Sequence, residues 1–310
     1  MGKKIIVIGH KNPDTDSIVA SLVGADYCKN VLKQAAVAAR AGNINKETKF
    51  ILDKFKVSAP AMFRPAGAND GIVLVDHNEA GQLADGLDFS KVERIIDHHK
   101  LQVITEKPID CRVETVGSTS SLLARLYKEA GRKIPAVMAK LLVAGILSDT
   151  LNLTSPTTTE ADKKTAKELN KTAKLKLAEF AKEMFAAKSD LSGVSIETVV
   201  NSDYKLFKMG KNNVGAAVWE TADPISVEAY KEKIVNFLKD KKTKEGLDYM
   251  FFFVVDIFKQ NSVLYAFSEK EKLMAEKVFK VKTKTDEILL PGIVSRKKQI
   301  IPPLTEELAK

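Results

Sequence analysis

The sequence predicts an α/β protein in which a doubly wound parallel sheet is followed by a smaller, mixed α+β domain. Two observations support this fold class. In the first half of the chain, short apolar runs alternate with helical patterns, as they do in parallel sheets with crossover helices. Later in the chain the apolar runs follow one another more closely, and Lys-Gln-Asn at 259–261 indicates a hairpin. A chain of 310 residues is long enough for two such domains.

The predicted first domain covers residues 1–187. Its apolar runs, which are typical of buried strands, are residues 3–9, 71–76 and 92–97. Its helical patterns cover about 16–32, 118–130, 136–148 and 159–187. Serine- and threonine-rich segments at 117–121 and 155–159 precede two of these helices and are typical of helix caps. The amide groups of residues 117–121 could equally meet an anion, because a helix N-terminus favours negative charge.

A segment at 188–195 contains serine, aspartate and glycine without periodicity, which indicates a linker. The predicted second domain covers residues 196–310. Its expected strands are 213–219, 248–258, 262–267 and a closing segment at 292–304, and its expected amphipathic helix lies near 225–240.

Composition narrows the function classes. The net charge of +9 comes mostly from lysines spaced along helices with glutamates, so it is weak support for a nucleic-acid partner. No apolar run reaches the roughly 18 residues of a membrane span, and the first strand begins without a signal-peptide pattern, so we expect a cytoplasmic protein. Two cysteines, Cys28 and Cys111, are too few for a disulfide framework or a cysteine-based zinc site.

Acids and histidines follow each predicted strand of the first domain. They are His10, Asp14 and Asp16 after the first strand, Asp76 and His77 at the second, and Asp97, His98 and His99 at the third, with Asp149 at the end of an apolar helix. All four histidines of the chain are in this group. Because ligands bind outside the carboxyl ends of the strands in open α/β sheets, we expect these residues at one edge of the sheet.

Each of these residues has a simpler explanation when it is taken alone. Asp14 or Asp16 could cap the helix that begins near Ser17, since a side-chain oxygen there accepts from free backbone amides. A lone His77 is typical of a loop histidine that a hydrogen bond holds. Four histidines at the ends of strands are hard to explain in that way, which favours a shared ligand.

Histidine combined with several carboxylates favours Mn²⁺, Co²⁺ or Zn²⁺ over Mg²⁺, which prefers oxygen ligands and keeps its waters. Four carboxylates, those of Asp14, Asp16, Asp76 and Asp149, would balance two divalent ions, and one of them could bridge the pair. Two ions about 3.5–4 Å apart acidify a bridging water for in-line displacement at phosphorus. The residues therefore predict a binuclear phosphohydrolase.

Four motifs of the first domain resemble those of the DHH phosphoesterase superfamily: GHKNPDTDS, VDHNE, IIDHHK and ILSDT. SRKKQ at 295–299, with LTSPTTTEAD at 153–162 and DYKLF at 203–207, narrows the resemblance to the family II inorganic pyrophosphatases, which manganese or cobalt activates. The resemblance spans nearly the whole chain, in the order of the family's motifs. It implies a DHH catalytic domain, a substrate-binding DHHA2-type domain, and an active site in the cleft between them.

The resemblance also implies roles for individual residues. His10 and Asp14 would ligate one metal ion, Asp16, His98 and Asp149 would ligate the other, and Asp76 would bridge the two. Asp97 would orient a histidine without binding metal. His99, Lys205, Arg296 and Lys297 would bind pyrophosphate, with arginine as a planar fork and lysine as a point charge. Asp76 and these four substrate ligands are the expected catalytic residues, whereas His77, Asn78 and Glu79 receive no ligand role.

The implied activity is hydrolysis of pyrophosphate to two orthophosphates by a hydroxide that bridges the two metal ions. The resemblance further implies two Mn²⁺ or Co²⁺ ions per subunit, additional Mg²⁺ with the substrate, and a homodimer without a nucleic-acid or membrane partner. About 50 residues separate His99 from Asp149, too few for the nucleotide-binding insertion of regulated relatives.

There are two alternatives, one within the enzyme class and one outside it. A DHH phosphodiesterase or exopolyphosphatase would act on short oligonucleotides, cyclic dinucleotides or polyphosphate, but the glycine-rich GGGH motif of the nuclease relatives is absent from this sequence. A nucleic-acid-binding or metal-sensing protein would not need two acidic metal sites, and no interleaving of aromatic and basic residues supports it.

Overall fold

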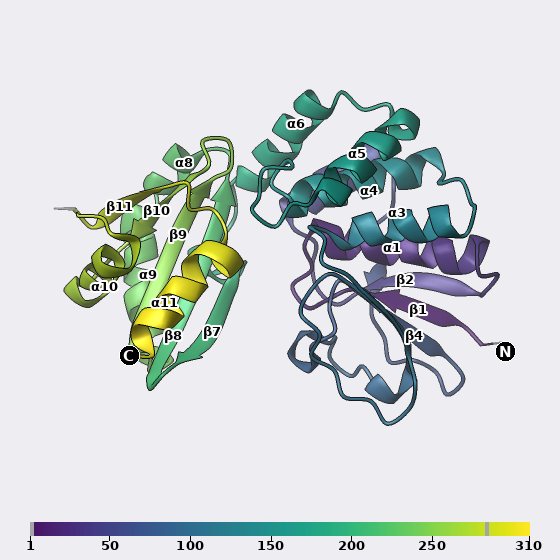
Figure 1. Cartoon of the computed structure of the whole chain (residues 1–310), viewed down its shortest axis with the longest axis horizontal. Helices are drawn as coiled ribbons and strands as arrows, with labels where there is room; N and C mark the ends of the chain where they lie inside the picture. The colour runs from purple at the N-terminus through teal and green to yellow at the C-terminus, as the bar shows by residue number, and fades with distance from the viewer. Residues whose placement is uncertain (1–2, 283–284) are drawn as a thin grey trace. The chain divides into compact units, whose positions relative to one another are not determined.

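The computed structural model describes residues 3–282 and 285–310, which form two compact units that divide between residues 184 and 185. Each unit has its own β-sheet (Figure 1). Helix α6 (Leu177–Ser189) continues across the division, and the predicted domain boundary at 187 and linker at 188–195 stay predictions. In the part of the chain that the structure describes, no helix combines the length and the apolar character needed to cross a membrane.

The first unit is built on a six-stranded sheet in which all strands run parallel. Its strands are β1 (Ile5–Ile8), β2 (Ala36–Arg40), β3 (Ala61–Met62), β4 (Gly71–Val75), β5 (Val92–Asp97) and β6 (Asp110–Val113). They lie in the order β3-β2-β1-β4-β5-β6, so the direction in which successive strands are added reverses between β1 and β4. This order is that of a doubly wound sheet and confirms the predicted fold class.

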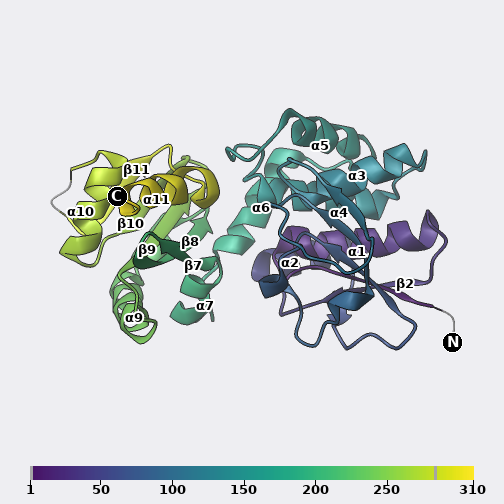
Figure 2. The ribbon, with the colours of Figure 1, turned by 60° about the horizontal axis from the view of Figure 1, so that its bottom comes forward.

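Helices cover one face of this sheet (Figures 1 and 2). They are α1 (Thr15–Asn30), α2 (Lys46–Phe55), α3 (Thr119–Glu129), α4 (Ala136–Asp149) and α5 (Glu160–Ala173). Helices α1 and α3 pack on the strands, and α4 packs on both of these helices. A Cβ atom at Gly24 of α1 would lie 2.9 Å from Cγ1 of Val7, so glycine allows the close approach of α1 to β1.

Loops rather than helices cover the opposite face of the sheet. Buried side chains of β1 and β4, among them Ile8 and Leu74, pack there against partly buried Phe63, Phe89 and Val103. Those three residues lie in the connections that follow β3, β4 and β5, and the connection after β4 includes two short 3₁₀ turns, Ala80–Gln82 and Phe89–Lys91. These connections bury this face of the sheet in place of α-helices. The strands are therefore apolar on both faces, as the sequence of β4 (Gly-Ile-Val-Leu-Val) indicates.

The second unit contains a mixed five-stranded sheet with the order β11-β10-β9-β8-β7. Its strands are β7 (Tyr204–Met209), β8 (Asn212–Thr221), β9 (Tyr249–Asp256), β10 (Asn261–Tyr265) and β11 (Glu287–Pro291). Only the pair of β8 and β9 is parallel. The hairpin predicted at 259–261 is confirmed, because β9 and β10 pair antiparallel with Asn261 opposite Asp256.

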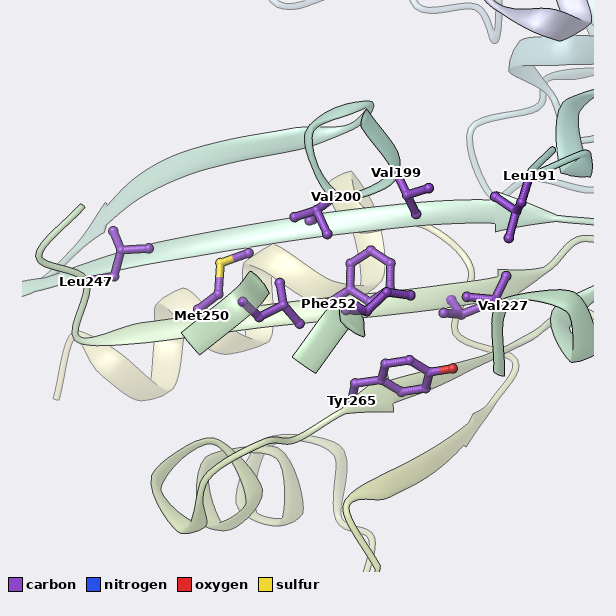
Figure 3. Close-up of a cluster of buried hydrophobic side chains, with 12 residues drawn as sticks. Leu191, Val199, Val200, Val227, Leu247, Met250, Phe252 and Tyr265 are labelled. Carbon is purple, nitrogen blue, oxygen red and sulfur yellow. The ribbon is translucent and has the colours of Figure 1, made fainter. Parts of the chain in front are cut away.

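Two groups of helices flank the second sheet. They are α7 (Ile196–Asn201), α8 (Pro224–Glu228) and α9 (Lys231–Lys244) on one side, and α10 (Glu269–Phe279) and α11 (Ile301–Leu308). Figure 3 shows the core on the first side, where Met250 and Phe252 of β9 face Val199, Val200 and Val227. The intervening Phe253 instead contacts Phe279 of α10, with ring centroids 6.2 Å apart. Because β9 is buried on both faces, its sequence is continuously apolar.

Three predicted elements differ in the structure. The helix expected at 159–187 is two helices, because Lys174 takes a left-handed backbone (φ 54°) that ends α5. The helix near 225–240 is likewise divided into α8 and α9. The closing segment at 292–304 was wrong as a strand: residues 296–300 form one π-helical turn that leads into α11, whose first turn contains two prolines and so loses no helical hydrogen bond.

Candidate metal centre

The carboxyl ends of β1 and β4 lie side by side where the strand order reverses, and this is where a doubly wound sheet binds its ligands. The chain leaves β1 through Gly9 and His10, and it leaves β4 through Asp76. Asp76 takes a left-handed backbone (φ 62°), which is uncommon for a residue with a side chain. Such conformations persist where the surrounding structure enforces them, which is frequent at functional sites.

Asp76 belongs to every group of potential metal ligands that the described residues form, and two of these groups contain the predicted metal ligands. His10, Asp14 and Asp76 form one of the two, and Asp16, Asp76, His98 and Asp149 form the other; within each group one ligand atom per residue lies within 4.8 Å of the others. Asp76, His98 and His99 form a further group of this kind. His10 Nε2 is 3.4 Å from Asp76 Oδ2, and His98 Nε2 is 3.4 Å from Asp76 Oδ1. The structure thus brings all six predicted metal ligands together, with one oxygen of Asp76 toward each histidine.

Asp14 and Asp16 are held in different ways. Asp14 caps helix α1, since its carboxylate accepts from the backbone amide of Ser17 at 2.9 Å. Asp16 is the first acid inside the helix and does not cap it. The sequence allowed either acid to be the cap. In the structure Asp14 is the cap, and Asp14 also belongs to one of the ligand groups.

The N-terminus of α3 receives the carboxylate of Asp16. The backbone amides of Thr119 and Ser120 donate to Asp16 at 2.7 and 3.1 Å, and the hydroxyl of Ser118 donates at 2.8 Å. The sequence allowed either an anion or an ordinary helix cap at residues 117–121, and the anion that these amides meet is a side chain of the protein itself, favoured by the free amides and the helix dipole. Ser118 also caps α3, so the capping prediction is confirmed as well.

Both ligand histidines present Nε2 to the carboxylates. His98 Nδ1 donates to the carbonyl of Val116 at 3.0 Å, and His10 Nδ1 donates to the carbonyl of Lys11 at 2.7 Å. A carbonyl can only accept, so these bonds place one proton of each ring on Nδ1 and direct Nε2 toward the acids. This is the arrangement that metal-binding imidazoles usually have.

The acids and histidines of the two ligand groups shift one another's pKa values. Burial opposes a charge on His10, but Asp14 and Asp76 outweigh burial and hold the pKa of His10 well above its ordinary value. In the same way Asp76 raises the pKa of His98 to about 9, against the effect of burial, and the two histidines lower the pKa of Asp76 well below its usual range. Burial and the nearby Asp76 raise the pKa of Asp16 to about 7.

The donor set fits a pair of divalent cations. Asp76 Oδ2 and His98 Nε2 are buried, and neither forms a hydrogen bond within the described ranges 3–282 and 285–310. Buried polar atoms of this kind are costly unless another group satisfies them. Four carboxylates around two imidazoles also match the mixed nitrogen and oxygen ligands that Mn²⁺ accepts.

His77, which follows Asp76, has no place in either group. Its Nδ1 donates to the carbonyl of Val75 at 2.9 Å, and burial lowers the pKa of the ring to about 4. The imidazole is therefore neutral at ordinary pH. Its Nε2 is buried and, like that of His98, forms no hydrogen bond among the residues that the structure describes, and the absence of a ligand role for His77 stays a prediction.

Asp97 orients His99 rather than the predicted metal ligand His98. Its Oδ1 lies 2.9 Å from His99 Nδ1, and the same oxygen accepts from the backbone amides of His98 and His99. Asn78 donates to the other oxygen of Asp97 at 2.6 Å and also to the carbonyl of Lys100 at 2.9 Å. The histidine whose side chain contacts Asp97 is therefore His99, which is expected to bind substrate.

The remaining predicted substrate ligands are in the second unit. Lys205 lies exposed on β7, and Lys297 is exposed in the π-helical turn at 296–300. The guanidinium of Arg296 binds Asp203, with Nη2 and Oδ1 2.6 Å apart, two residues before Lys205. Gln299 fixes the turn by accepting from the amides of Val294 and Ser295 at 3.0 Å each. Lys205, Arg296 and Lys297 therefore belong to a different unit from the six candidate metal ligands.

Two buried acids near the centre have roles that the sequence did not reveal. Asp162 accepts from the amide of Gly117 at 2.8 Å and from the hydroxyl of Ser121 at 2.6 Å, and so fixes the start of α3. Its capping box with Thr159 is readable as Thr-x-x-Asp before a helix, and confirms the cap predicted there. Glu47 lies in α2, a helix that the sequence did not predict, and accepts from the hydroxyls of Thr15 in α1 and Ser148 in α4. Its spacing in the sequence contains no signal for this role.

Comparisons with known proteins agree with this geometry. The family model described as the DHH family, N-terminal domain, matches residues 4–146, and the model of the DHHA2 domain matches residues 182–307. A probable manganese-dependent inorganic pyrophosphatase of Clostridium acetobutylicum is 39% identical over 305 residues, with 98% of each chain covered. The manganese-dependent inorganic pyrophosphatase of Methanocaldococcus jannaschii is 40% identical and covers 96% of this chain and 97% of its own.

Solved structures extend the likeness to the fold. The crystal structure of a putative family II inorganic pyrophosphatase from Methanococcus jannaschii matches with a TM-score of 0.80 and 37% identity, covering 99% of this chain and 100% of the other. An exopolyphosphatase-related protein from Bacteroides fragilis matches with a TM-score of 0.52 at 15% identity, which shows a shared fold alone.

Proposed function

The chain belongs to the manganese-dependent, family II inorganic pyrophosphatases, and on this premise we propose that it hydrolyses inorganic pyrophosphate to two orthophosphate ions. The observation that supports this most strongly is the pair of ligand groups that share Asp76. One buried carboxylate with an oxygen toward each of two histidines suits two adjacent divalent ions, the device used for displacement at phosphorus.

The proposed ligands divide into two sets. His10 and Asp14 hold one ion, Asp16, His98 and Asp149 hold the other, and Asp76 bridges them. We take Mn²⁺ as the resident ion, Co²⁺ as the substitute, and two ions per subunit. Such ions, when bound, acidify a water molecule and draw charge from the phosphoryl oxygens. Asp97 keeps the ring of His99 in one orientation through the 2.9 Å contact with Nδ1.

The proposed substrate ligands are His99, Lys205, Arg296 and Lys297, and an additional Mg²⁺ ion accompanies pyrophosphate. These side chains neutralise an anion that the metal charge, already matched by four carboxylates, does not fully balance. Asp203 orients the fork of Arg296 through the 2.6 Å ion pair, so that its remaining N–H groups are available for phosphate oxygens. The expectation that substrate lies between the two domains stays a prediction.

The wider setting is also part of the proposal. We propose a homodimer in the cytoplasm, without nucleic-acid or membrane partners. The thiols of Cys28 and Cys111 are free, which fits a reducing compartment.

The direct test is phosphate release from pyrophosphate after chelation and reloading. We expect the chelated chain to be inactive, Mn²⁺ or Co²⁺ to restore hydrolysis, and Mg²⁺ without either ion to restore little, because the histidines suit the softer ions. Elemental analysis of the reloaded chain should find two Mn²⁺ ions per chain. Hydrolysis that survives chelation, or that Mg²⁺ alone restores fully, would contradict the proposal.

A further inference from the structure

Glu47 is a buried acid next to the candidate metal centre that none of the motifs includes. It lies in the first turn of α2 and is only 1% exposed. Helix α2 also buries the apolar side chains of Ile51 and Leu52, and such side chains alone could hold a helix of this length against the rest of the unit. Burying a carboxyl group is costly unless hydrogen bonds compensate, so an acid at this place needs a reason of its own.

One oxygen of Glu47 joins the two segments that contain Asp16 and Asp149, two of the three acids of the second ligand group. Oε2 accepts from the hydroxyl of Thr15 at 2.8 Å and from the hydroxyl of Ser148 at 2.8 Å. Thr15 stands between Asp14 and Asp16, and Ser148 directly precedes Asp149. Both donors are buried as well, at 0% and 4% exposure, so water does not compete for these bonds.

The bonds to Glu47 constrain the distance between two helix ends. Thr15 begins α1, and Ser148 is the next-to-last residue of α4, so one acceptor fixes the start of one helix to the end of the other. Both donors are on short side chains, and each is directly beside a predicted ligand. A shift of either helix end would therefore move a ligand carboxylate by a similar amount.

We propose that Glu47 is a positioning residue of the metal centre, which holds Asp16 and Asp149 at the separation that one divalent ion requires. The proposal rests on the proposed metal-dependent function and adds to it a residue outside the two ligand groups. Glu47 acts through Thr15 and Ser148 and does not itself contact metal or substrate. Partners that orient ligands in this way typically contribute about 10- to 100-fold to metal affinity.

The test measures Mn²⁺ affinity of the purified full chain, by titration of the chelated protein and detection of free Mn²⁺ by electron paramagnetic resonance. Glu47→Ala removes the acceptor, and we expect Mn²⁺ affinity to fall about 10-fold or more. Glu47→Gln keeps an oxygen that can accept from both hydroxyls, and we expect it to recover most of the loss. Ser148→Ala should also weaken binding, and its combination with Glu47→Ala should weaken binding less than the product of the two single effects.

The matched control is Glu160→Ala, which removes an acid from the first turn of another helix of the same unit, where the side chain is 88% exposed. It should leave Mn²⁺ affinity unchanged.

The inference is overturned if Glu47→Ala binds Mn²⁺ like the unaltered chain while only its thermal midpoint falls, or if Glu47→Gln loses as much affinity as Glu47→Ala. If Glu47→Ala does not fold, Glu47→Gln and Ser148→Ala decide: normal affinity in Ser148→Ala overturns the inference. Binding is measured without pyrophosphate, so a chain that binds Mn²⁺ but does not hydrolyse pyrophosphate would refute the proposed function alone.

Discussion

At the scale of single residues, Asp76 connects the two ligand groups. It is 1% exposed, and Thr119 donates to its Oδ1 at 2.9 Å, while each of its oxygens lies 3.4 Å from a histidine. Its left-handed backbone turns the side chain at the end of β4, immediately beside the end of β1. A carboxylate with two oxygens is the smallest side chain that can serve both groups at once.

Asp76→Ala should therefore remove both metal ions together. We expect fewer than one Mn²⁺ per chain after desalting, measured by elemental analysis, and pyrophosphate hydrolysis at the level of the buffer. Asp85→Ala is the control, because Asp85 pairs with Lys11 in the same unit while its side chain is 96% exposed. Retention of both ions by Asp76→Ala would show that Asp76 does not bridge them.

The raised pKa of His98 makes the metal-free chain sensitive to alkaline pH. The folded chain binds this proton more tightly than the unfolded chain, since the pKa rises from 6.5 to about 9. The resulting stabilisation is complete below pH 6.5 and is lost as pH rises toward 9. Asp16, with a pKa near 7, loses its own contribution over the lower range from about 4 to 7, in the same direction. The thermal midpoint of the chelated chain should thus fall between about pH 6.5 and about pH 8.5.

Bound Mn²⁺ should reverse this trend, because the ion binds imidazole without its proton and binding releases protons. We expect the increase in thermal midpoint on adding Mn²⁺ to be larger at the higher pH. Calorimetric scans with chelator and with Mn²⁺ at each pH make the comparison. A midpoint of the chelated chain that is flat over this range would contradict the assignment of the proton to His98.

At the scale of elements, the metal centre depends on how closely α4 approaches the start of α3. A Cβ atom at Gly145 of α4 would lie 2.6 Å from Asp16 Oδ1 and would overlap the hydroxyl of Ser120. Asp162 holds the start of α3 from the other side, through Gly117 and Ser121. The carboxylate of Asp16 is thus enclosed between two helices that leave no space for another methyl group.

Gly145→Ala should disturb both stability and metal binding. Overpacking of this kind costs about 1–3 kcal/mol, which urea denaturation of the chelated chain would measure. We expect Mn²⁺ affinity to fall as well, because Asp16 has to move. At Gly81, by contrast, no heavy atom of the described residues lies within 4 Å of a built Cβ, so Gly81→Ala should change the free energy of unfolding by no more than about 0.5 kcal/mol. Equal effects of the two substitutions would contradict the packing argument.

The sequence predicted the strands that end in the candidate ligands and missed the elements around them. Strand β4 is apolar throughout, so the sequence indicates both a buried strand and the end of this strand at Asp76. Strand β2, with the sequence Ala-Val-Ala-Ala-Arg, and the two-residue β3 contain too few large apolar residues to be recognised. Because α2 lies between them, Glu47 could not be placed beside Thr15. Contacts such as this one, across 32 residues, depend on tertiary packing that no local pattern contains.

At the scale of the whole molecule, the six candidate metal ligands and three of the four predicted substrate ligands lie in different units, and each unit has its own core. The first unit contains the six candidate metal ligands, and the second contains Lys205, Arg296 and Lys297 on the sheet edge β7 and the turn before α11. Each unit is matched by its own family model, over residues 4–146 and 182–307. Metal binding and substrate binding should therefore be separable by mutation.

Lys205→Ala should weaken substrate handling and leave the metal ions bound. Loss of a charged hydrogen bond to phosphate costs about 1.5–3 kcal/mol, which corresponds to roughly a 10- to 100-fold loss in kcat/KM for pyrophosphate. Lys208→Ala is the control on the same strand, because residues three apart in a strand point to opposite faces. Loss of Mn²⁺ from Lys205→Ala, or equal losses of kcat/KM in the two variants, would contradict the division of roles.

The central claim is that pyrophosphate is the substrate, and the kcat/KM of the Mn²⁺-loaded chain for three phosphate compounds tests it most directly. Phosphate release would be followed with pyrophosphate and tripolyphosphate, and mononucleotide release with a short dinucleotide, at one protein concentration. Hydrolysis of pyrophosphate should exceed the other two reactions by orders of magnitude and should disappear in Asp76→Ala. Preference for the dinucleotide or for tripolyphosphate would contradict the claim.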